Sequence, residues 1–274
     1  MFFTPTLNPR ALIKTPILYT MNVKRTIYLL LESLVNTFFP RFCCVCNKKL
    51  VHDEQFICLH CLLHLPYTHF KGKKGNPIER IICDDRICVE HANSLFYYKQ
   101  KSSYSRIFFH FKYYNHPQVA IYFGRLMAQD LALTDFFTTI DCIIPIPLSK
   151  QRQKSRGYNQ SEKIAEGISQ ITHIPVDTTS VIREVDNPSQ TRMTGEDRWL
   201  NVNRIFHLAH PESVAHKHVL IVDDMITTGS TIRACAHTLT QVDGVKISVI
   251  SLGTSQRNRK YNFPSDIFPS KEDI

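Results

Sequence analysis

Two adjacent carboxylates, Asp223 and Asp224, stand between an apolar run and a loop rich in small hydroxyl residues. The run, residues 219–222, is mostly β-branched and predicts a buried strand. A helix is expected after the loop, whose members are Thr227, Thr228, Gly229, Ser230 and Thr231. Backbone amides at such a junction bind anions, and a glycine lets the backbone approach a phosphate closely. The stretch therefore predicts a phosphate site with an acidic edge.

The two acids need their own explanation, because a carboxylate beside a phosphate repels it. They are explained if they accept hydrogen bonds from sugar hydroxyls or help to hold a bridging Mg²⁺. A plain helix cap would need only one acid. The sequence has neither the Lys-containing phosphate loop of nucleoside triphosphatases nor the Gly-x-Gly-x-x-Gly fingerprint of dinucleotide enzymes. We interpret the stretch as a sugar-phosphate site.

A run of cations follows a second predicted strand, residues 142–147, which ends at a proline. The run contains Lys150, Arg152, Lys154 and Arg156 and ends at Gly157. Charge runs are usually solvated surface, but this one lies between a strand and a helix expected to begin at Asn159. That position favours a clamp for pyrophosphate, which arginine binds bidentately.

Four cysteines have the spacing of two metal-binding knuckles, Cys43-x-x-Cys46 and Cys58-x-x-Cys61. Two such pairs supply the four thiolates of a closed tetrahedral zinc site. So short a segment, with few large apolar side chains, would need a metal to hold its shape. The spacing also admits Cys44 in place of Cys43, or a histidine as substitute ligand, namely His52, His60 or His64. We interpret Cys83 and Cys88 as ordinary thiols.

Nine aromatic residues lie among four cations between residues 95 and 114. Exposed rings stack on bases while cations follow the phosphates, so this stretch could bind single-stranded DNA. The alternative, which we favour, is that the rings pack in the core. Its support is the helical spacing of Ile107, Phe108 and Phe111, which would face one side.

The chain has 33 Lys and Arg against 24 Asp and Glu, a net charge of +9, which suits phosphorylated or nucleic-acid partners. Residues 41–114 hold 12 of these cations and six of the acids, so six of the nine net charges lie there. The nine cysteines come without a signal peptide or an apolar run of membrane-spanning length. We therefore expect a cytoplasmic protein whose thiols are reduced or bound to metal.

The elements that must position these groups follow from periodicity. Apolar stripes predict two helices, one through Ile164, Ala165, Ile168 and Ile171 and one through Ile232, Cys235, Ala236 and Leu239. Residues 245–252 predict a further strand. Strands alternating with helices predict an α/β fold, a parallel sheet flanked by helices with its ligand beyond the carboxyl ends of the strands.

The expected organisation has four parts. Residues 1–24 form a tail, with Met21 as an alternative start, and residues 25–92 form a helix at 25–39 followed by the four-cysteine zinc module. Residues 93–254 form the α/β domain, and residues 255–274 form a second tail. Within the domain, the polar residues 187–202 are expected either to close over a substrate or to be a plain crossover.

The Asp223 to Thr231 stretch resembles the phosphoribosyl pyrophosphate (PRPP) signature of type I phosphoribosyltransferases. In those enzymes the two acids bind the ribose hydroxyls and the loop binds the 5′-phosphate. The chain as a whole resembles the ComF family of ComFC-like competence proteins. This likeness is carried by Ile-Pro-Ile-Pro-Leu at 144–148, Arg-Gly-Tyr-Asn-Gln at 156–160, Phe-Lys-Tyr at 111–113 and the amino-terminal cysteine knuckles.

The resemblance implies a structural zinc and Mg²⁺-dependent binding of PRPP, with possible transfer of the phosphoribosyl group to a nitrogen acceptor. Asp223 and Asp224 would hold the ribose, and Arg152 and Arg156 would balance the charge of the leaving pyrophosphate. It also implies a role in DNA uptake during natural transformation, with single-stranded DNA and other competence proteins as partners. The alternative is a protein that binds single-stranded DNA without catalysis and uses the PRPP site only for binding or sensing.

Overall fold

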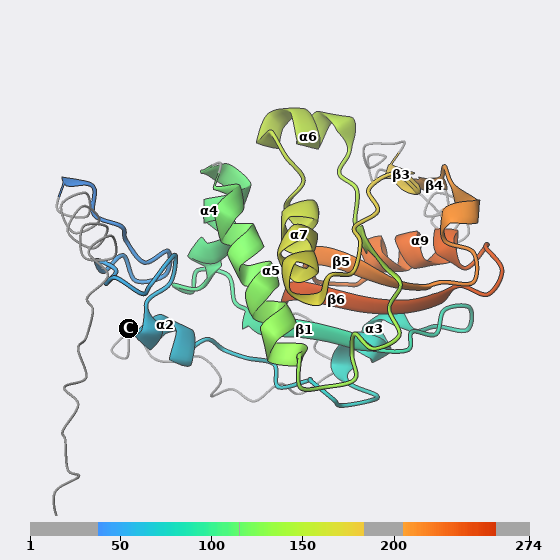
Figure 1. Cartoon of the computed structure of the whole chain (residues 1–274), viewed down its shortest axis with the longest axis horizontal. Helices are drawn as coiled ribbons and strands as arrows, with labels where there is room; N and C mark the ends of the chain where they lie inside the picture. Colours follow the sequence, from blue (N-terminus) through green and yellow to red (C-terminus); the bar gives the residue numbers. More distant parts are fainter. Residues whose placement is uncertain (1–37, 115, 184–204, 256–274) are drawn as a thin grey trace, which may run out of the picture. The chain divides into compact units, whose positions relative to one another are not determined.

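The computed structural model describes residues 38–114, 116–183 and 205–255 (Figure 1). The chain divides into two compact units, residues 1–41 and 42–274, and the described helices and strands discussed below all belong to the second. The expected helix at 25–39, apart from its last two residues, and the segment 187–202 lie outside the described residues, as do both predicted tails except Ser255. No helix in the described parts of the chain combines the length and apolar character needed to cross a membrane.

The centre of the fold is a four-stranded sheet in the order β1-β6-β5-β2, with every neighbouring pair parallel. The strands are β1 (Ala92–Tyr98), β2 (Cys142–Pro145), β5 (His218–Ile226) and β6 (Lys246–Ser255). Since the strands are parallel, their carboxyl ends meet at one edge of the sheet. This confirms the predicted parallel sheet, and it brings the ends of β5 and β2 side by side.

Helices cover both faces of the sheet, because the side chains of each strand alternate between two cores (Figure 1). Leu220 and Val222 pack into the core that also contains α4 (Ser105–Tyr113), α5 (Pro117–Leu131) and α7 (Gln160–Thr172). Val219 and Ile221 pack into the core that contains α3 (Pro77–Ile82) and α9 (Ser230–Leu239). The predicted α/β fold is therefore confirmed.

Two glycines set the distance between α5 and α7. A Cβ atom at Gly124 would lie 2.2 Å from the backbone oxygen of Ile164, and one at Gly167 would lie 2.1 Å from that of Ile121. The backbones thus approach too closely for any larger residue. The close crossing fixes the position of α7 against α5, and Ser161 near the start of α7 contacts Asp223.

The four-cysteine module joins the same body. It contains α2 (Leu59–Leu63), and an isolated bridge pairs Phe42 with Lys49. Its buried side chains belong to the same core as those of α4 and α5. The hydroxyl of Tyr104 donates to the backbone oxygen of Cys61 at 3.2 Å. The module is thus packed on α4, so its shape and the position of α4 depend on each other.

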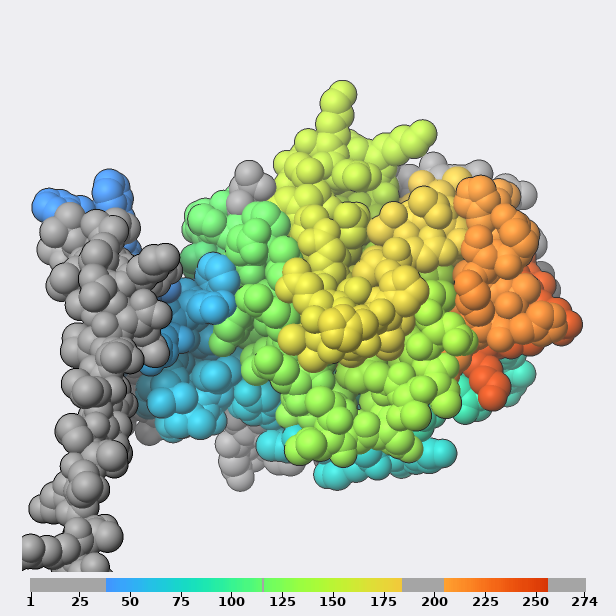
Figure 2. Space-filling view, viewed as in Figure 1, coloured from blue at the N-terminus to red at the C-terminus, as the bar shows by residue number. Residues whose placement is uncertain are grey.

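Two segments lie outside the alternation of sheet strands and packed helices that the sequence predicts. The cation run forms a short helix, α6 (Lys150–Arg156), capped by Ser149 and with no buried residue, and its side chains stand out from the surface in Figure 2. A small antiparallel pair, β3 (Val181–Arg183) and β4 (Phe206–Leu208), flanks residues 184–204. A 3₁₀ turn, η1 (Pro211–Ser213), then leads into β5.

Candidate functional site

The acid pair lies within β5, because the strand continues to Ile226 beyond the apolar run. A carboxylate oxygen of Asp223 accepts from the hydroxyl of Ser161 at 3.1 Å and from the backbone amide of Asp224 at 2.8 Å. The carboxylate of Asp224 lies 2.8 Å from the ammonium of Lys112 on α4. Three elements, β5, α4 and α7, thus converge on the two acids.

The pKa of Asp223 is raised. Burial, followed by the charge of Asp224, raises it to about 7, although the hydrogen bond from Ser161 and the charge of Lys112 act in the opposite direction. Near neutral pH the pair therefore carries a proton part of the time. A sugar hydroxyl donating to Asp223 would favour the ionised form.

The loop after β5 contains Gly229 with φ of 73°, a left-handed conformation that glycine adopts without strain. A Cβ atom here would lie 2.6 Å from the Cγ2 atom of Ile81 on α3. The sequence interpretation explained this glycine by the approach of a phosphate. The structure adds a second reason for a glycine here, since it accommodates the positive φ and the packing of α3 behind the loop.

α9 starts directly after Gly229, which has no side chain to cap it. The hydroxyl of Thr228 donates to the hydroxyl of Ser230 at 3.1 Å, and both side chains are exposed. Amides at the start of a helix attract an anion, and the dipole of this ten-residue helix adds to that attraction. The hydroxyls, the helix start and the acids thus lie on one strand-loop-helix segment.

The four predicted cations lie on α6. Lys150, Arg152 and Lys154 are exposed, and Arg156 donates to the side-chain oxygen of Gln160 at 2.8 Å. Among the described residues, neither Arg152 nor Arg156 forms an ion pair with a carboxylate. The structure therefore places the arginines before α7, whose residue Ser161 contacts Asp223, and leaves their side chains apart from the acids.

The connection from α6 to α7 is anchored on both sides. The side chain of Asn159 donates to the backbone oxygen of Ile146 at 3.0 Å and caps α7 by accepting from the amide of Ser161. The hydroxyl of Tyr158 donates to the backbone oxygen of Phe111 on α4. As a result, the end of β2, the start of α7 and the end of α4 form one polar edge.

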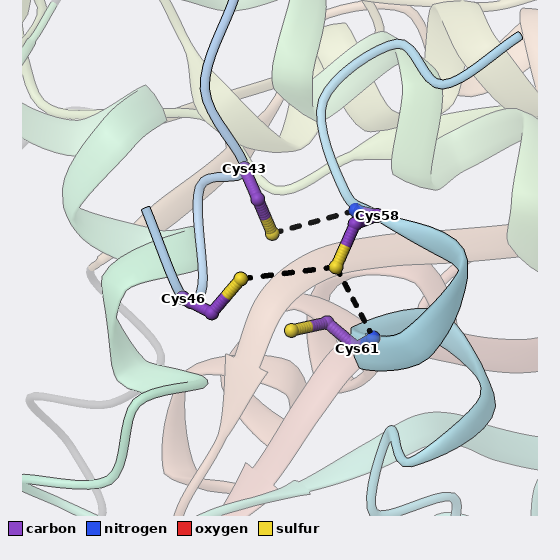
Figure 3. Close-up of side chains that lie close together, drawn as sticks. All are labelled: Cys43, Cys46, Cys58 and Cys61. Carbon is purple, nitrogen blue, oxygen red and sulfur yellow. Dashed lines mark hydrogen bonds between the residues drawn. The ribbon is translucent and has the colours of Figure 1, made fainter. Parts of the chain in front are cut away.

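The structure brings Cys43, Cys46, Cys58 and Cys61 together, as the spacing predicted (Figure 3). Their four sulfur atoms lie within 4.8 Å of one another, and those of Cys46 and Cys58 are 3.7 Å apart. Two sulfurs on a tetrahedral zinc, each bonded at about 2.3 Å, are roughly 3.8 Å apart. The distances therefore fit a zinc-binding module.

Amide groups point at the sulfurs as well. The Cys43 sulfur accepts from the amides of Val45 and Cys58, each at 3.4 Å, and the Cys58 sulfur accepts from the amide of Cys61 at 3.4 Å. A hydrogen bond from the Cys61 thiol lowers the pKa of Cys43 to about 4, and the same bond raises the pKa of Cys61, while burial raises that of Cys58. Without a metal, the negative charge is therefore favoured on the Cys43 sulfur.

Cys44 does not join the group, which resolves the alternative left open by the sequence. Its amide donates to the backbone oxygen of Phe56 at 2.9 Å, and burial raises the pKa of its thiol. Within the described residues, the histidines considered as substitutes are also outside the group of possible ligands, namely His52, His60 and His64.

The aromatic stretch divides between core and surface. Most of its rings are buried, including those of the predicted helical face, so core packing accounts for them. Three rings on α4 and directly after it remain exposed, Phe109 by 47%, Tyr113 by 67% and Tyr114 by 63%. The rings of Phe109 and Tyr113 are 5.6 Å apart. This surface group, which we call the α4 rings, is what remains for a ligand.

Two hollows lie between the four-cysteine module and α4, and Arg106 and Phe109 line both. One encloses about 750 Å³ and the other about 480 Å³. Their walls contain cations, small polar side chains and aromatic rings, and no Asp or Glu. The lining residues are Cys43, Cys44, Val45, Cys46, Asn47, Tyr98, Gln100, Lys101, Ser102, Ser103, Ser105, Arg106, Phe109, His110 and Tyr114. This pair of hollows, the α4 groove, suits an anionic ligand with flat rings.

Comparison with known proteins places this geometry in a family. The family described as phosphoribosyl transferase domain matches residues 113–272. The DNA utilization protein YhgH of Shigella flexneri is 26% identical over 214 residues, which cover 76% of this chain and 87% of that protein. Competence protein F of Haemophilus influenzae is 27% identical over 232 residues, covering 78% and 97%. Competence protein ComFC of Bacillus subtilis is 33% identical over 97 residues, covering 35% and 37%.

The chain belongs to the phosphoribosyl transferase domain family and, within it, to the ComF family. The family match covers the strands, loop and helix that carry Asp223 and Asp224. The four-cysteine module precedes the matched segment.

Sequence reasoning overlooked two residues of the site. From the sequence, Lys112 is placed among the cations of the aromatic stretch and in the Phe-Lys-Tyr resemblance, without a role in the site, and Ser161 is not included. Both lie far along the chain from the acids they contact. The available signal was the Phe-Lys-Tyr segment itself, since a cation in an otherwise apolar helix face needs a partner.

Proposed function

We propose that the protein binds Mg²⁺-PRPP at the end of β5 and takes part in the uptake of DNA. The observation that carries the proposal is the acid pair of β5 followed directly by the hydroxyl loop and the start of α9. The ribose hydroxyls would donate to Asp223 and Asp224, and the 5′-phosphate would meet the loop, Thr227 to Thr231. The role in DNA uptake is inferred from relatives named for competence and DNA utilization.

If the protein is a transferase, a nitrogen nucleophile attacks C1 of the ribose, and the bond from C1 to the pyrophosphate oxygen breaks. The pyrophosphate leaves with that electron pair and its Mg²⁺. The carboxylates of Asp223 and Asp224 would stabilise the cationic sugar, and Arg152 and Arg156 on α6 would balance the leaving charge. None of the residues of α6 is buried, so the helix could move toward the ligand without breaking a buried contact.

A screen for pyrophosphate release tests this proposal. Purified protein is incubated with Mg²⁺-PRPP and a panel of nucleobases, and single-stranded DNA is included as a separate addition. Release that depends on one base and is lost in the Arg156→Ala variant would establish a transferase. Binding of PRPP without release from any acceptor would support the non-catalytic alternative.

A second function, binding of single-stranded DNA, is favoured by the α4 groove. Bases would stack on the α4 rings, while Lys101 and Arg106 would lie near the phosphates. The basic excess of residues 41–114 adds a favourable field. Duplex DNA would bind less well, because its paired bases are not free to stack.

We expect affinity for single-stranded DNA to fall steeply between 50 and 200 mM salt. In a plot of the logarithm of the binding constant against the logarithm of the salt concentration, each neutralised phosphate should contribute a slope of about −0.7. Replacing Phe109 and Tyr114, which both line the groove, by alanine should weaken this affinity, since each lost stacking contact costs about 1–3 kcal/mol. Fluorescence anisotropy with a labelled oligonucleotide measures both effects. Leu133→Ala is the matched control, because Leu133 is 99% exposed and lines neither hollow. Equal, salt-insensitive binding of single strand and duplex would contradict the assignment.

A further inference from the structure

Lys112 has a position that neither the fold nor the family match explains. Its ammonium lies 2.8 Å from a carboxylate oxygen of Asp224, and the two side chains are only 19% and 14% exposed. The ammonium also lies 5.3 Å from the centre of the Phe108 ring. Removing two charges from water costs energy that their attraction often fails to repay, so such a pair is weak evidence for a stabilising role.

The helix that carries Lys112 is held at both ends. At its start, Arg106 donates to the backbone oxygen of Val45 at 3.0 Å, and the hydroxyl of Tyr104 reaches Cys61. At its end, the backbone oxygen of Phe111 accepts from the hydroxyl of Tyr158. These contacts place the ammonium between β5 and the connection from α6 to α7. Lys112 is thus presented to the acids by a rigid element.

The acids need a cation at this place. Asp223 and Asp224 are adjacent, and the proposed ligand brings several further negative charges to the same edge of the sheet. Within the described part of the chain, Lys112 is the one cation in an ion pair with either acid. A carboxylate has room for more than one donor, so Asp224 can keep Lys112 and still accept from a sugar hydroxyl.

We propose that Lys112 is a positioning residue of the PRPP site: it orients the carboxylate of Asp224 toward the ribose. This inference rests on the proposed function. It adds a residue outside the matched domain segment, on the helix that also lines the α4 groove.

The test compares four proteins by calorimetry with Mg²⁺-PRPP: wild type, Lys112→Met, Lys112→Arg and Lys71→Met. Lys71 is the matched control, because its ammonium lies at the same 2.8 Å from Asp130 in a more exposed pair. We expect Lys112→Met to lose at least about tenfold in affinity, the usual effect of a lost hydrogen bond to a charged group. Lys112→Arg should recover most of this loss, and Lys71→Met should bind like the wild type.

Two further measurements separate positioning from mere support of the fold. The affinity for ribose 5-phosphate should be lower in Lys112→Met than in the wild type by a similar factor. The affinity for free Mg²⁺-pyrophosphate should be the same in both proteins, because this ligand has no ribose. In an Asp224→Asn background, which removes the carboxylate that Lys112 pairs with, adding Lys112→Met should change PRPP affinity by less than about twofold. This background also covers the case in which the single variant does not fold.

The outcomes are distinct. If wild type binds PRPP and Lys112→Met binds it equally well, the inference is wrong and the proposed function stands. If Lys112→Met weakens pyrophosphate as much as PRPP, the lysine supports the fold and does not position Asp224. If the wild type does not bind PRPP at all, the proposed function fails first, and the role of Lys112 fails with it.

Discussion

Replacing Cys58 and Cys61 by serine is expected to abolish zinc binding and to destabilise the whole second unit. The four sulfurs already lie at distances that suit a tetrahedral ion. Zinc bound to short four-ligand modules contributes roughly 10–16 kcal/mol of apparent free energy at pH 7. The effect should extend beyond the module, because Cys43 and Cys61 are buried in the same core as Phe111 and Phe123.

Metal analysis and thermal unfolding of protein purified without chelator check this expectation. One zinc per chain is expected in the wild type, and the unfolding temperature of the double variant should be markedly lower. Cys83→Ser with Cys88→Ser is the matched control, because both cysteines lie outside the ligand group. Full zinc occupancy in the Cys58 and Cys61 variant, or no zinc in the wild type, would show that this is not a zinc site.

Mg²⁺-PRPP is expected to stabilise the protein against heat, and the double change Asp223→Asn and Asp224→Asn should remove that stabilisation. A ligand that binds only the native state at about 100 times Kd adds about 2.7 kcal/mol to the free energy of unfolding. The amides at the start of α9 would still meet the 5′-phosphate in the variant. The charge-assisted hydrogen bonds to the ribose would be lost, so affinity should fall.

Asp130→Asn is the matched control for this measurement, since Asp130 is a carboxylate paired with a lysine away from β5. Zinc content should be unchanged in both variants, which shows that the module remains intact. A double variant that is stabilised as much as the wild type would mean that the acids do not contact the ribose. No shift in the wild type would remove the basis of the phosphoribosyl assignment.

The same measurement has an expected pH dependence. Burial and the neighbouring Asp224 raise the pKa of Asp223 to about 7, so its carboxyl group is mainly protonated below that value. A protonated carboxyl is a poorer acceptor for a sugar hydroxyl. Stabilisation by PRPP should therefore be larger at pH 8 than at pH 6. The single variant Asp223→Asn should keep only the weaker dependence that comes from ionisation of the ligand's own phosphates, whose second pKa is about 6.

Local spacing determined much of this protein from the sequence alone. An apolar run followed by two acids, four hydroxyls and a glycine predicts a strand, a turn and a helix without knowledge of other segments. The cysteine pairs likewise place two sulfurs on one side of a short turn. These predictions succeeded because each depends on backbone geometry over a few residues. The apolar periodicity of α7 and α9 likewise predicts which face of each helix is buried.

Tertiary structure alone decided which side chains meet across the fold. Nothing in the sequence pairs Lys112 with Asp224, or places Ile81 behind Gly229, because both contacts depend on how helices are seated on the sheet. The same holds for the aromatic stretch, where the helical period marks a face but the packing of the cysteine module leaves Phe109 at the surface. Such contacts depend on the packing of whole elements, which residue spacing within one segment does not specify.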